Sequence, residues 1–320
     1  MLNILITGAN GFIGSFLVEE AIRRNWQTWA GIRQSSSLVY LQDPRIHFID
    51  LDYAHKDQLK KQILAHAARY GSWDYVIHNA GVTKCLDSSD FNHINYFFTK
   101  QLIEALQETG QTPKKFVLMS SLSAHCCEGD TAYGRSKLKA EHFLRSQSNF
   151  PFIILCPTGV YGPREKDYYL LLKTIQKGLD ITVGFEPQKL SFIYVKDLVK
   201  AVYLSLDRPV ENRTYLVSDG QVYSDREYTE IAKNALGKKR VLSMRIPLFA
   251  LKIISIVAED FSRFRGQVST LNRDKYRIMA QRDWSCDTRP LHAELGFEAD
   301  YDLQHGIEES VRWYRENSWL

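Results

Sequence analysis

Cysteine is scarce in this chain of 320 residues. The five of them include no CxxC motif, and their odd number argues against a disulfide framework. The nine histidines lack the spacing of metal ligands, so we predict no metal site. His125, which precedes Cys126 and Cys127, is interpreted as a loop or packing feature. These absences favour a reducing, cytoplasmic environment.

Long apolar runs and blocks of like charge are also lacking. The longest apolar stretch, residues 246–257, is interrupted by Lys252 and is shorter than the roughly 20 residues that span a bilayer, so we expect no transmembrane segment. The start, MLNILITGANGFIG, has no basic n-region and predicts a first strand rather than a signal peptide. The net charge of +4 is not concentrated, which gives little support to nucleic-acid binding and leaves a small molecule as the expected partner.

What the chain does contain is an alternation of strand and helix patterns in its first half. Its length favours a large α/β domain with a smaller companion. Strand-like apolar runs occur at residues 3–7, 28–32, 46–49, 75–78, 116–120 and 152–155. Helical patterns separate many of them, at residues 14–25, 56–70, 91–110 and 133–147. Because crossovers of this length join parallel strands, the sequence predicts an α/β fold with a Rossmann-type, doubly wound parallel sheet.

A glycine-rich turn, TGANGFIG at residues 7–14, follows the first predicted strand and opens the first helix. Closely spaced glycines in this context let backbone amides approach a pyrophosphate at a helix N-terminus. The strand and helix around the motif, rather than the glycine spacing alone, favour dinucleotide binding. We therefore predict cofactor contacts at Gly8, Asn10, Gly11, Phe12, Ile13 and Gly14.

The acid that would hold the ribose 2′-hydroxyl of NAD is missing from its usual place. No Asp or Glu occurs between Glu20 and Asp43, and the second strand is followed by Arg33-Gln34-Ser35-Ser36. A guanidinium and hydroxyl donors suit the additional phosphate of NADP, so we predict NADP in preference to NAD. The alternative is that Arg33 is a solvated charge. Asp50 and Leu51 are expected near the adenine, although an Asp there is equally an ordinary turn residue.

The alternation weakens after Tyr161-Gly162-Pro163, where strand-like runs at residues 190–195 and 214–217 stand in otherwise mostly helical sequence. We expect residues 1–165 to form the dinucleotide-binding domain, with strands near residues 190–218 returning to it. Residues 166–320 would then form a smaller, mostly helical C-terminal substrate lobe.

Tyr133 and Lys137 lie four residues apart at the start of a helical pattern and therefore share one helix face. A phenol with a pKa of about 10 needs a neighbouring positive charge to exchange protons near neutrality, and Lys137 supplies one. Ser121 follows a buried-type strand, at the sheet edge where such folds bind ligands, and can hydrogen-bond a reacting oxygen; Ser123 is an alternative. Another strand leads to the small residues Asn79, Ala80 and Gly81, which suit close approach to a cofactor.

The motifs TGANGFIG, HNAG, SS, YGRSK and PTGVYGP, in this order, resemble the extended short-chain dehydrogenase/reductase family, in its NAD-dependent epimerase/dehydratase group. The resemblance extends over nearly the whole chain. It implies a catalytic set of Ser121, Tyr133 and Lys137, with Asn95 as a supporting fourth member, and nicotinamide contacts at Pro157 and Val160. It further implies an enzyme that transfers a hydride reversibly to or from a secondary alcohol or ketone carbon, with Tyr133 as general acid/base. A homodimer is a candidate assembly.

Two departures from the nucleotide-sugar members of the family bear on the substrate. Those members typically carry an Arg that binds the diphosphate, just before the aromatic run of the strand that returns from the substrate lobe. At this place the chain reads Lys189-Leu190-Ser191-Phe192. Their Arg-Pro-Gly-Asp-like stretch is also absent, since residues 281–287 read QRDWSCD. Both differences favour a comparatively apolar, steroid- or terpenoid-like alcohol or ketone. The opposing hypothesis is that Lys189, Arg164 or Arg282 binds a diphosphate from another position.

Other interpretations remain open at this point. Residues 245–265 combine an apolar run with Lys252, Arg263 and Arg265, which suits a lid over an apolar substrate or a helix on a membrane surface; a lobe-packing or dimer helix is the favoured alternative. The competing functions are a nucleotide-sugar epimerase or dehydratase and a non-catalytic dinucleotide-binding sensor. Weaker candidates for the wall of a substrate pocket are Tyr168, Tyr169 and Phe185.

Overall fold

The computed structural model describes residues 1–125, 131–266, 269 and 271–320; Cys126 and Cys127, and the interpretation given to them, lie outside this set. A seven-stranded sheet has the order β11-β6-β5-β4-β1-β2-β3. Every neighbouring pair in it is parallel. The strands are β1 (Asn3–Thr7), β2 (Gln27–Gly31), β3 (Ile46–Ile49), β4 (Tyr75–His78), β5 (Lys115–Met119), β6 (Phe152–Pro157) and β11 (Arg213–Val217). This confirms the predicted doubly wound sheet.

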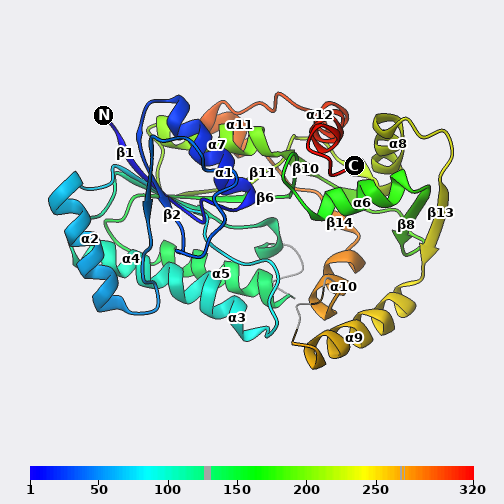
Figure 1. The fold of residues 1–320 in the computed structure, drawn as a ribbon, viewed down its shortest axis with the longest axis horizontal. Helices are drawn as coiled ribbons and strands as arrows, with labels where there is room; N and C mark the ends of the chain where they lie inside the picture. Colours follow the sequence, from blue (N-terminus) through cyan, green and yellow to red (C-terminus); the bar gives the residue numbers. More distant parts are fainter. Residues whose placement is uncertain (126–130, 267–268, 270) are drawn as a thin grey trace.

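Helices cover both faces of this sheet, which is why strands such as β1 and β6 are buried along their whole length. On one face lie α1 (Phe12–Arg23), α7 (Val195–Asp207) and α11 (Arg289–Leu295), and on the other lie α2 (Lys56–Tyr70), α4 (Phe98–Glu108) and α5 (Ala132–Arg145) (Figure 1). Each face has its own apolar core: Leu17 and Val202 belong to the first, and Leu59 and Leu102 to the second. The two cores hold the carboxyl ends of the strands in a fixed row.

The helical pattern at residues 91–110 folds as three consecutive segments. These are α3 (Ser89–Phe91), a π-helical segment η1 (Asn92–Phe97) and α4. π-Helical turns are rare and frequently occur at functional sites. Here the π-helical segment carries Asn95, which is 1% exposed, toward the interior.

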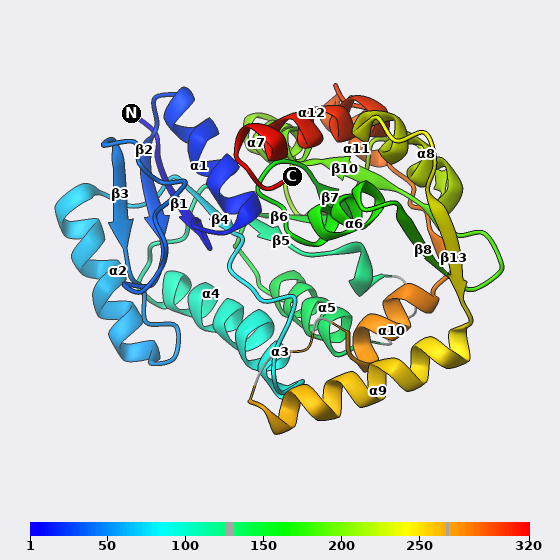
Figure 2. The same ribbon diagram turned by 45° about the vertical axis from the view of Figure 1, so that its right-hand side comes forward.

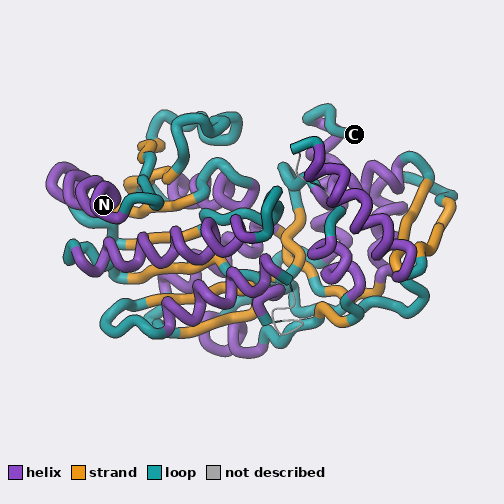
Figure 3. The backbone as a smooth tube through the Cα atoms, turned by 90° about the horizontal axis from the view of Figure 1, so that it is seen from below, coloured by secondary structure: helices purple, strands orange, loops and turns teal. Residues whose placement is uncertain are grey.

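The smaller lobe has an aromatic core and more strands than its mostly helical sequence pattern indicates. Its helices α6 (Asp167–Gln176), α8 (Asp225–Leu236) and α12 (Leu303–Glu316) enclose Tyr161, Phe192, Tyr194 and Tyr228. Its short strands form separate small sheets, β10–β7, β12–β9–β14 and β13–β8. Their bounds are β7 (Gly159–Tyr161), β8 (Leu179–Val183), β9 (Lys189–Leu190), β10 (Phe192–Tyr194), β12 (Tyr223–Ser224), β13 (Leu242–Ile246) and β14 (Asp283–Trp284). Figure 3 shows the β8–β13 ladder apart from the large sheet, in the half of the molecule that contains the C-terminus.

One predicted strand, at residues 190–195, is divided between two of these sheets. The hydroxyl of Ser191 is buried and donates to the carbonyl oxygen of Gln221 (2.8 Å), between the end of β9 and the start of β10. The two halves of the run therefore pair with different strands. An apolar run alone could not indicate this break.

Two further helices, α9 (Leu248–Phe264) and α10 (Arg273–Ala280), pack against each other below the small lobe. In Figure 2, β13 leads directly into α9, which runs along the lower edge of the molecule beneath α10 and ends below α3. Within the described ranges, no helix combines the length and the apolar character needed to cross a membrane.

Candidate active site

The turn between β1 and α1 has a backbone that only glycine accommodates at two positions. Gly8 has a φ of +63°, and a Cβ there would lie 2.8 Å from the Cα of Ala80. A Cβ on Gly14 would overlap the carbonyl oxygen of Gly8. Helix α1 follows Gly11 without a side-chain cap or an acid in its first turn, so no side chain competes for its terminal amides. The residues present therefore fit a dinucleotide pyrophosphate.

The segment 79–81 connects this turn to the predicted catalytic residues. The Nδ2 of Asn79 donates to the carbonyl oxygen of Gly8 (3.4 Å), and the amide of Ala80 donates to Thr7 Oγ1 (3.0 Å). A Cβ on Gly81 would lie 3.2 Å from Lys137 Nζ. Small residues are thus required where the backbone passes between the glycine turn and the lysine.

Tyr133, Lys137 and Ser121 are brought together at the carboxyl edge of the sheet. Lys137 is buried, its Nζ donates to the carbonyl oxygen of Met119 (2.8 Å), and desolvation lowers its pKa to about 8 despite the opposing charge of Glu141. Desolvation raises the pKa of Tyr133, whereas a hydrogen bond with Ser121 lowers it. The phenol is therefore next to a hydroxyl and on one helix face with a cation, as proton exchange requires.

The neighbouring serines have different roles in the structure. Ser121 precedes the short helix η2 (Leu122–Ala124), and its Oγ accepts a hydrogen bond from the amide of Ser123 (3.2 Å) while also bonding the phenol of Tyr133. The hydroxyl of Ser120 instead donates to the buried carboxylate of Glu141. Ser121 is thus the serine whose hydroxyl the structure links to the tyrosine.

Asn95 contacts the site through two backbone segments. Its Oδ1 accepts from the amide of Val82 (2.8 Å), and its Nδ2 donates to the carbonyl oxygen of Val82 and to Ser136 Oγ, both at 3.0 Å. Ser136 in turn donates to the carbonyl oxygen of Tyr133 (2.7 Å). Asn95 therefore fastens the loop after Gly81 to the first turn of the catalytic helix.

The NAD dependent epimerase/dehydratase family profile matches residues 4–218, about two thirds of the chain. The chain belongs to this family. A ceramide reductase from Caulobacter vibrioides is 26% identical to it over 99% of this chain and 96% of that protein. Sterol demethylase protein B from Methylococcus capsulatus is 22% identical over the full length of both chains.

Solved structures of enzymes that are named after nucleotide sugars share the fold. A UDP-glucose 4-epimerase from Thermotoga maritima, solved with UDP-glucose, has a TM-score of 0.77 at 19% identity and covers 99% of this chain and 100% of its own. A dTDP-glucose 4,6-dehydratase from Bacillus anthracis, solved with NAD, has a TM-score of 0.75 at 19% identity, covering 100% of this chain and 98% of its own. As a member of the family whose profile matches residues 4–218, the chain is an enzyme of an NAD-dependent family.

A polar cluster around the buried Glu141 lies beside Lys137 of the triad. The sequence did not indicate it. Glu141, one helical turn beyond Lys137, bonds Ser120, His125 (3.0 Å) and Arg145 (2.7 Å). Burial alone would raise its pKa, but these hydrogen bonds and charges hold the pKa below its usual value. Burial raises the pKa of the nearby Cys156 thiol. The Glu141 carboxylate is therefore ionised in a largely dry setting.

Three groups of this cluster are of the types that bind zinc. The ligand atoms of His125, Glu141 and Cys156 lie within 4.8 Å of one another. In the structure they bond each other and Arg145 instead, with the Cys156 sulfur 3.4 Å from His125 Nε2. The absence of a metal remains a prediction. Sequence spacing could not reveal the grouping, because the three residues come from different elements.

The residues predicted to contact the adenosine follow β2 and β3, at the end of the sheet opposite β11. Arg33 is exposed after β2, and its guanidinium has no partner among the described residues. The Oδ2 of Asp50 accepts from the amide of Gln34 (3.0 Å), and Leu51 is buried. Pro157 ends β6 and Val160 lies in β7, on the nicotinamide side implied by the family resemblance.

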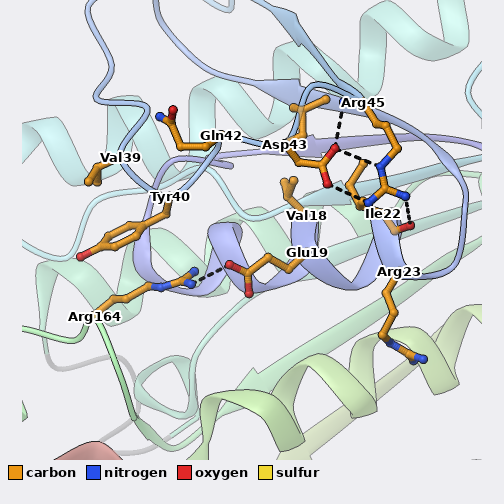
Figure 4. Close-up of a pocket in the computed structure, with 11 residues that line it drawn as sticks. Val18, Glu19, Ile22, Arg23, Val39, Tyr40, Gln42, Asp43, Arg45 and Arg164 are labelled. Atoms are coloured by element: carbon orange, nitrogen blue, oxygen red, sulfur yellow. Dashed lines mark hydrogen bonds and ion pairs between the residues drawn. The ribbon is translucent and has the colours of Figure 1, made fainter. Parts of the chain in front are cut away.

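The three basic residues of the opposing diphosphate hypothesis have other partners in the structure. All three nitrogens of the Arg282 guanidinium donate to backbone carbonyl oxygens, those of Val183, Glu186, Met279 and Ala280, at 2.7–3.1 Å. Lys189 is exposed and lies 3.7 Å from Asp283. Arg164 lies beside a pocket of about 500 Å³ on the outer side of α1, where it bonds Glu19 (2.6 Å) and stacks on Tyr40 (Figure 4).

The helices α9 and α10 close over the start of the catalytic helix. The Oδ2 of Asp274, in α10, accepts from the amides of Ala132 (2.8 Å) and Tyr133 (3.4 Å). A pocket of about 220 Å³ lies there, lined by residues of α3, α5, α9 and α10. Of the weaker candidates for a pocket wall, Tyr169 bonds the carbonyl oxygen of Trp319 (2.6 Å) and Phe185 is 67% exposed, whereas Tyr168 packs against the smaller lobe's core.

Proposed function

We propose that this enzyme is an NADP-dependent oxidoreductase that interconverts a secondary alcohol and a ketone on an apolar, lipid- or steroid-like substrate. The observation that carries the proposal is the engagement of Arg282, which uses every nitrogen of its guanidinium on backbone carbonyl oxygens. A diphosphate would have to compete with these bonds. The names of two relatives, a ceramide reductase and a sterol demethylase protein, agree with an apolar substrate.

The triad residues have distinct tasks in this proposal. The nicotinamide would supply the hydride. Ser121 orients the substrate oxygen, and Tyr133 donates a proton to it during reduction and accepts one during oxidation. The charge of Lys137 favours the phenolate form of Tyr133. Asn95 is a positioning residue, because it acts through Ser136 and the backbone of Tyr133.

The preference for NADP rests on the charge at the end of β2. The exposed guanidinium of Arg33 is free to pair with a 2′-phosphate, and no acid follows β2 to bind a 2′-hydroxyl. We expect NADPH to bind more tightly than NADH and Arg33→Ala to narrow the difference. Arg69→Ala, which alters another exposed arginine, on α2, is the matched control. Tighter binding of NADH by the unaltered protein would overturn the preference.

Two assays on the cofactor-loaded protein test the substrate class. In the first, NADPH oxidation is followed with long-chain keto-lipids and ketosteroids. In the second, calorimetric titration measures binding of UDP, dTDP and GDP. The proposal expects turnover of an apolar ketone and no micromolar nucleotide binding. Micromolar binding of a nucleotide, with no response to the ketones, would overturn it.

A nucleotide-sugar epimerase is the second candidate. A UDP-glucose 4-epimerase solved with UDP-glucose shares the fold over 99% of this chain and 100% of its own. That function would use the same Ser121, Tyr133 and Lys137 while the cofactor stays bound through the cycle. Measurement of the cofactor that co-purifies distinguishes the two. A tightly retained NAD supports the epimerase, and an exchangeable NADP supports the reductase.

A further inference from the structure

Helix α9 turns its more apolar side to the solvent. Its exposed large side chains form one stripe along the helix, with 70% of Phe249, 59% of Ile253, 62% of Val257, 55% of Phe261 and 90% of Phe264 accessible. The opposite side buries Leu251 and Ser255. At 1.5 Å per residue, 17 residues extend about 25 Å. Ordinary surface helices have the reverse arrangement, and a contiguous exposed stripe of this kind indicates a binding surface.

Strand β13, which leads into α9 (Figure 2), has exposed apolar side chains of its own. Leu242 and Met244 are exposed on that strand, and Ile181 is exposed on its partner β8. Exposed apolar side chains therefore occur both on α9 and on the strands that precede it in the fold.

This segment is strongly basic. Residues 238–265 contain seven Lys or Arg and two acids, a net formal charge of +5 against +4 for the whole chain. The two acids, Glu259 and Asp260, are both paired with Arg273 of α10, at 3.1 and 3.3 Å. Arg273, which lies outside the segment, thus offsets one of their two negative charges, whereas Lys252 is exposed beside the apolar stripe.

We infer that the exposed face of α9 and β13 docks on an anionic lipid surface. An apolar stripe flanked by Lys and Arg is the arrangement with which helices lie in a membrane interface. The other side of the same α9–α10 pair contacts the first turn of the catalytic helix through Asp274. The inference rests on the proposed apolar substrate, which such docking would place within reach of the site.

The positive charge of residues 238–265 favours an anionic lipid surface over a second copy of the protein as the partner of this face. A symmetric dimer through this face would bring two segments of net charge +5 together, and like charges at an interface oppose association. An anionic membrane is attracted by the same charges. Sedimentation velocity of the free protein, with and without the face altered, separates the two occupants.

The test is flotation of the full-length protein with vesicles that contain no substrate. One set is phosphatidylcholine, and the other has about a third phosphatidylglycerol. We expect binding to the second set, weakened by high salt. Phe249→Ser/Val257→Ser should lower vesicle binding by about tenfold or more, while the control Val39→Ser/Leu64→Ser, also exposed but on the other lobe, should not. Lys252→Gln should cost about fivefold on anionic vesicles.

The inference is overturned if neither vesicle set binds, or if the two double variants bind alike. It is also overturned if Phe249→Ser/Val257→Ser dissociates a dimer that has no affinity for vesicles. Turnover of a short, water-soluble ketone should be equal in the unaltered protein and in this variant. Because vesicle binding is measured without substrate, failure of the proposed function would show only in the turnover assays.

Discussion

Two helices of this enzyme, α5 and α9, depart in opposite directions from the usual distribution of side chains. Helix α5 buries charged groups, since Lys137 and Glu141 are 7% and 0% exposed. Helix α9 exposes aromatic groups, since Phe249 and Phe264 are 70% and 90% exposed. Burying a charge and exposing a large apolar side chain to water both cost free energy unless a partner compensates them. The difference is that partners compensate the charges of α5 inside the protein, whereas the surface of α9 has no partner within the described chain.

The compensation in α5 is visible atom by atom. Lys137 bonds the carbonyl oxygen of Met119, and Glu141 bonds Ser120, His125 and Arg145. Buried charges are tolerated when paired and hydrogen-bonded in this way. The comparison therefore suggests that α5 serves a function inside the molecule and α9 one outside it. Four changes can break or sharpen this contrast.

The largest effect is expected at Tyr133. Tyr133→Phe keeps the ring but removes the proton that it exchanges, so turnover should fall by a factor of about 10²–10⁴ with cofactor affinity preserved. Steady-state kinetics with a soluble ketone and a fluorescence titration of NADPH measure the two quantities. Ile253→Ser on α9 is the control and should leave both unchanged. Unaltered turnover in the phenylalanine variant would remove Tyr133 from the mechanism.

The second effect concerns Glu141 and is seen in both stability and pH dependence. Glu141→Gln removes the charged partner of Arg145, whose side chain is 35% exposed, and should lower the free energy of unfolding by about 2 kcal/mol in urea titrations. The Glu141 charge raises the pKa of Lys137, which is about 8. Without it that pKa falls, so Lys137 loses its proton at lower pH and the alkaline limb of turnover should shift to lower pH.

The exposed pair of Glu230 and Lys233 provides the comparison for that variant. Glu230→Gln should change stability far less, because water replaces the lost partner. An unshifted alkaline limb in Glu141→Gln would mean that the carboxylate serves structure alone.

A smaller effect is expected at Asp274, which connects α5 with α10, the helix that packs against α9. Asp274→Ala removes the acceptor for the amides of Ala132 and Tyr133, and loss of such a cap costs about 1 kcal/mol. We expect a higher KM with a modest change in kcat. Asp274→Asn keeps one side-chain oxygen and should restore most of the loss. Equal kinetics in all three proteins would show that α10 does not influence the catalytic helix.

The smallest effect is expected at Phe264. Because 90% of its side chain is already in water, Phe264→Ser should change the free energy of unfolding by less than about 0.5 kcal/mol. Chemical denaturation of the free protein measures this. A loss well above that value would show that the face of α9 is covered in solution, contrary to the contrast drawn with α5.

Much of the fold followed from local patterns. The predicted bounds of β1, β3, β4 and α2 agree with the structure. The three strands are short apolar runs, which in β1 and β4 are also largely buried, and α2 repeats its apolar residues with helical spacing. The motif order also led to the family. The same reasoning missed the strands of the smaller lobe, such as β8 and β13, whose outward residues are exposed and whose pairing joins segments about 60 residues apart.

The sequence by itself determined which residues share a helix face: Tyr133 with Lys137, and Phe249 with Ile253 and Val257. Only the tertiary structure decided what each face meets. It placed Glu141 among Ser120, His125 and Cys156, committed Arg282 to backbone carbonyl oxygens, and left the stripe on α9 in water. The physical reason is that helical periodicity is a local property of the chain, whereas burial and hydrogen-bond partners arise from elements distant in sequence.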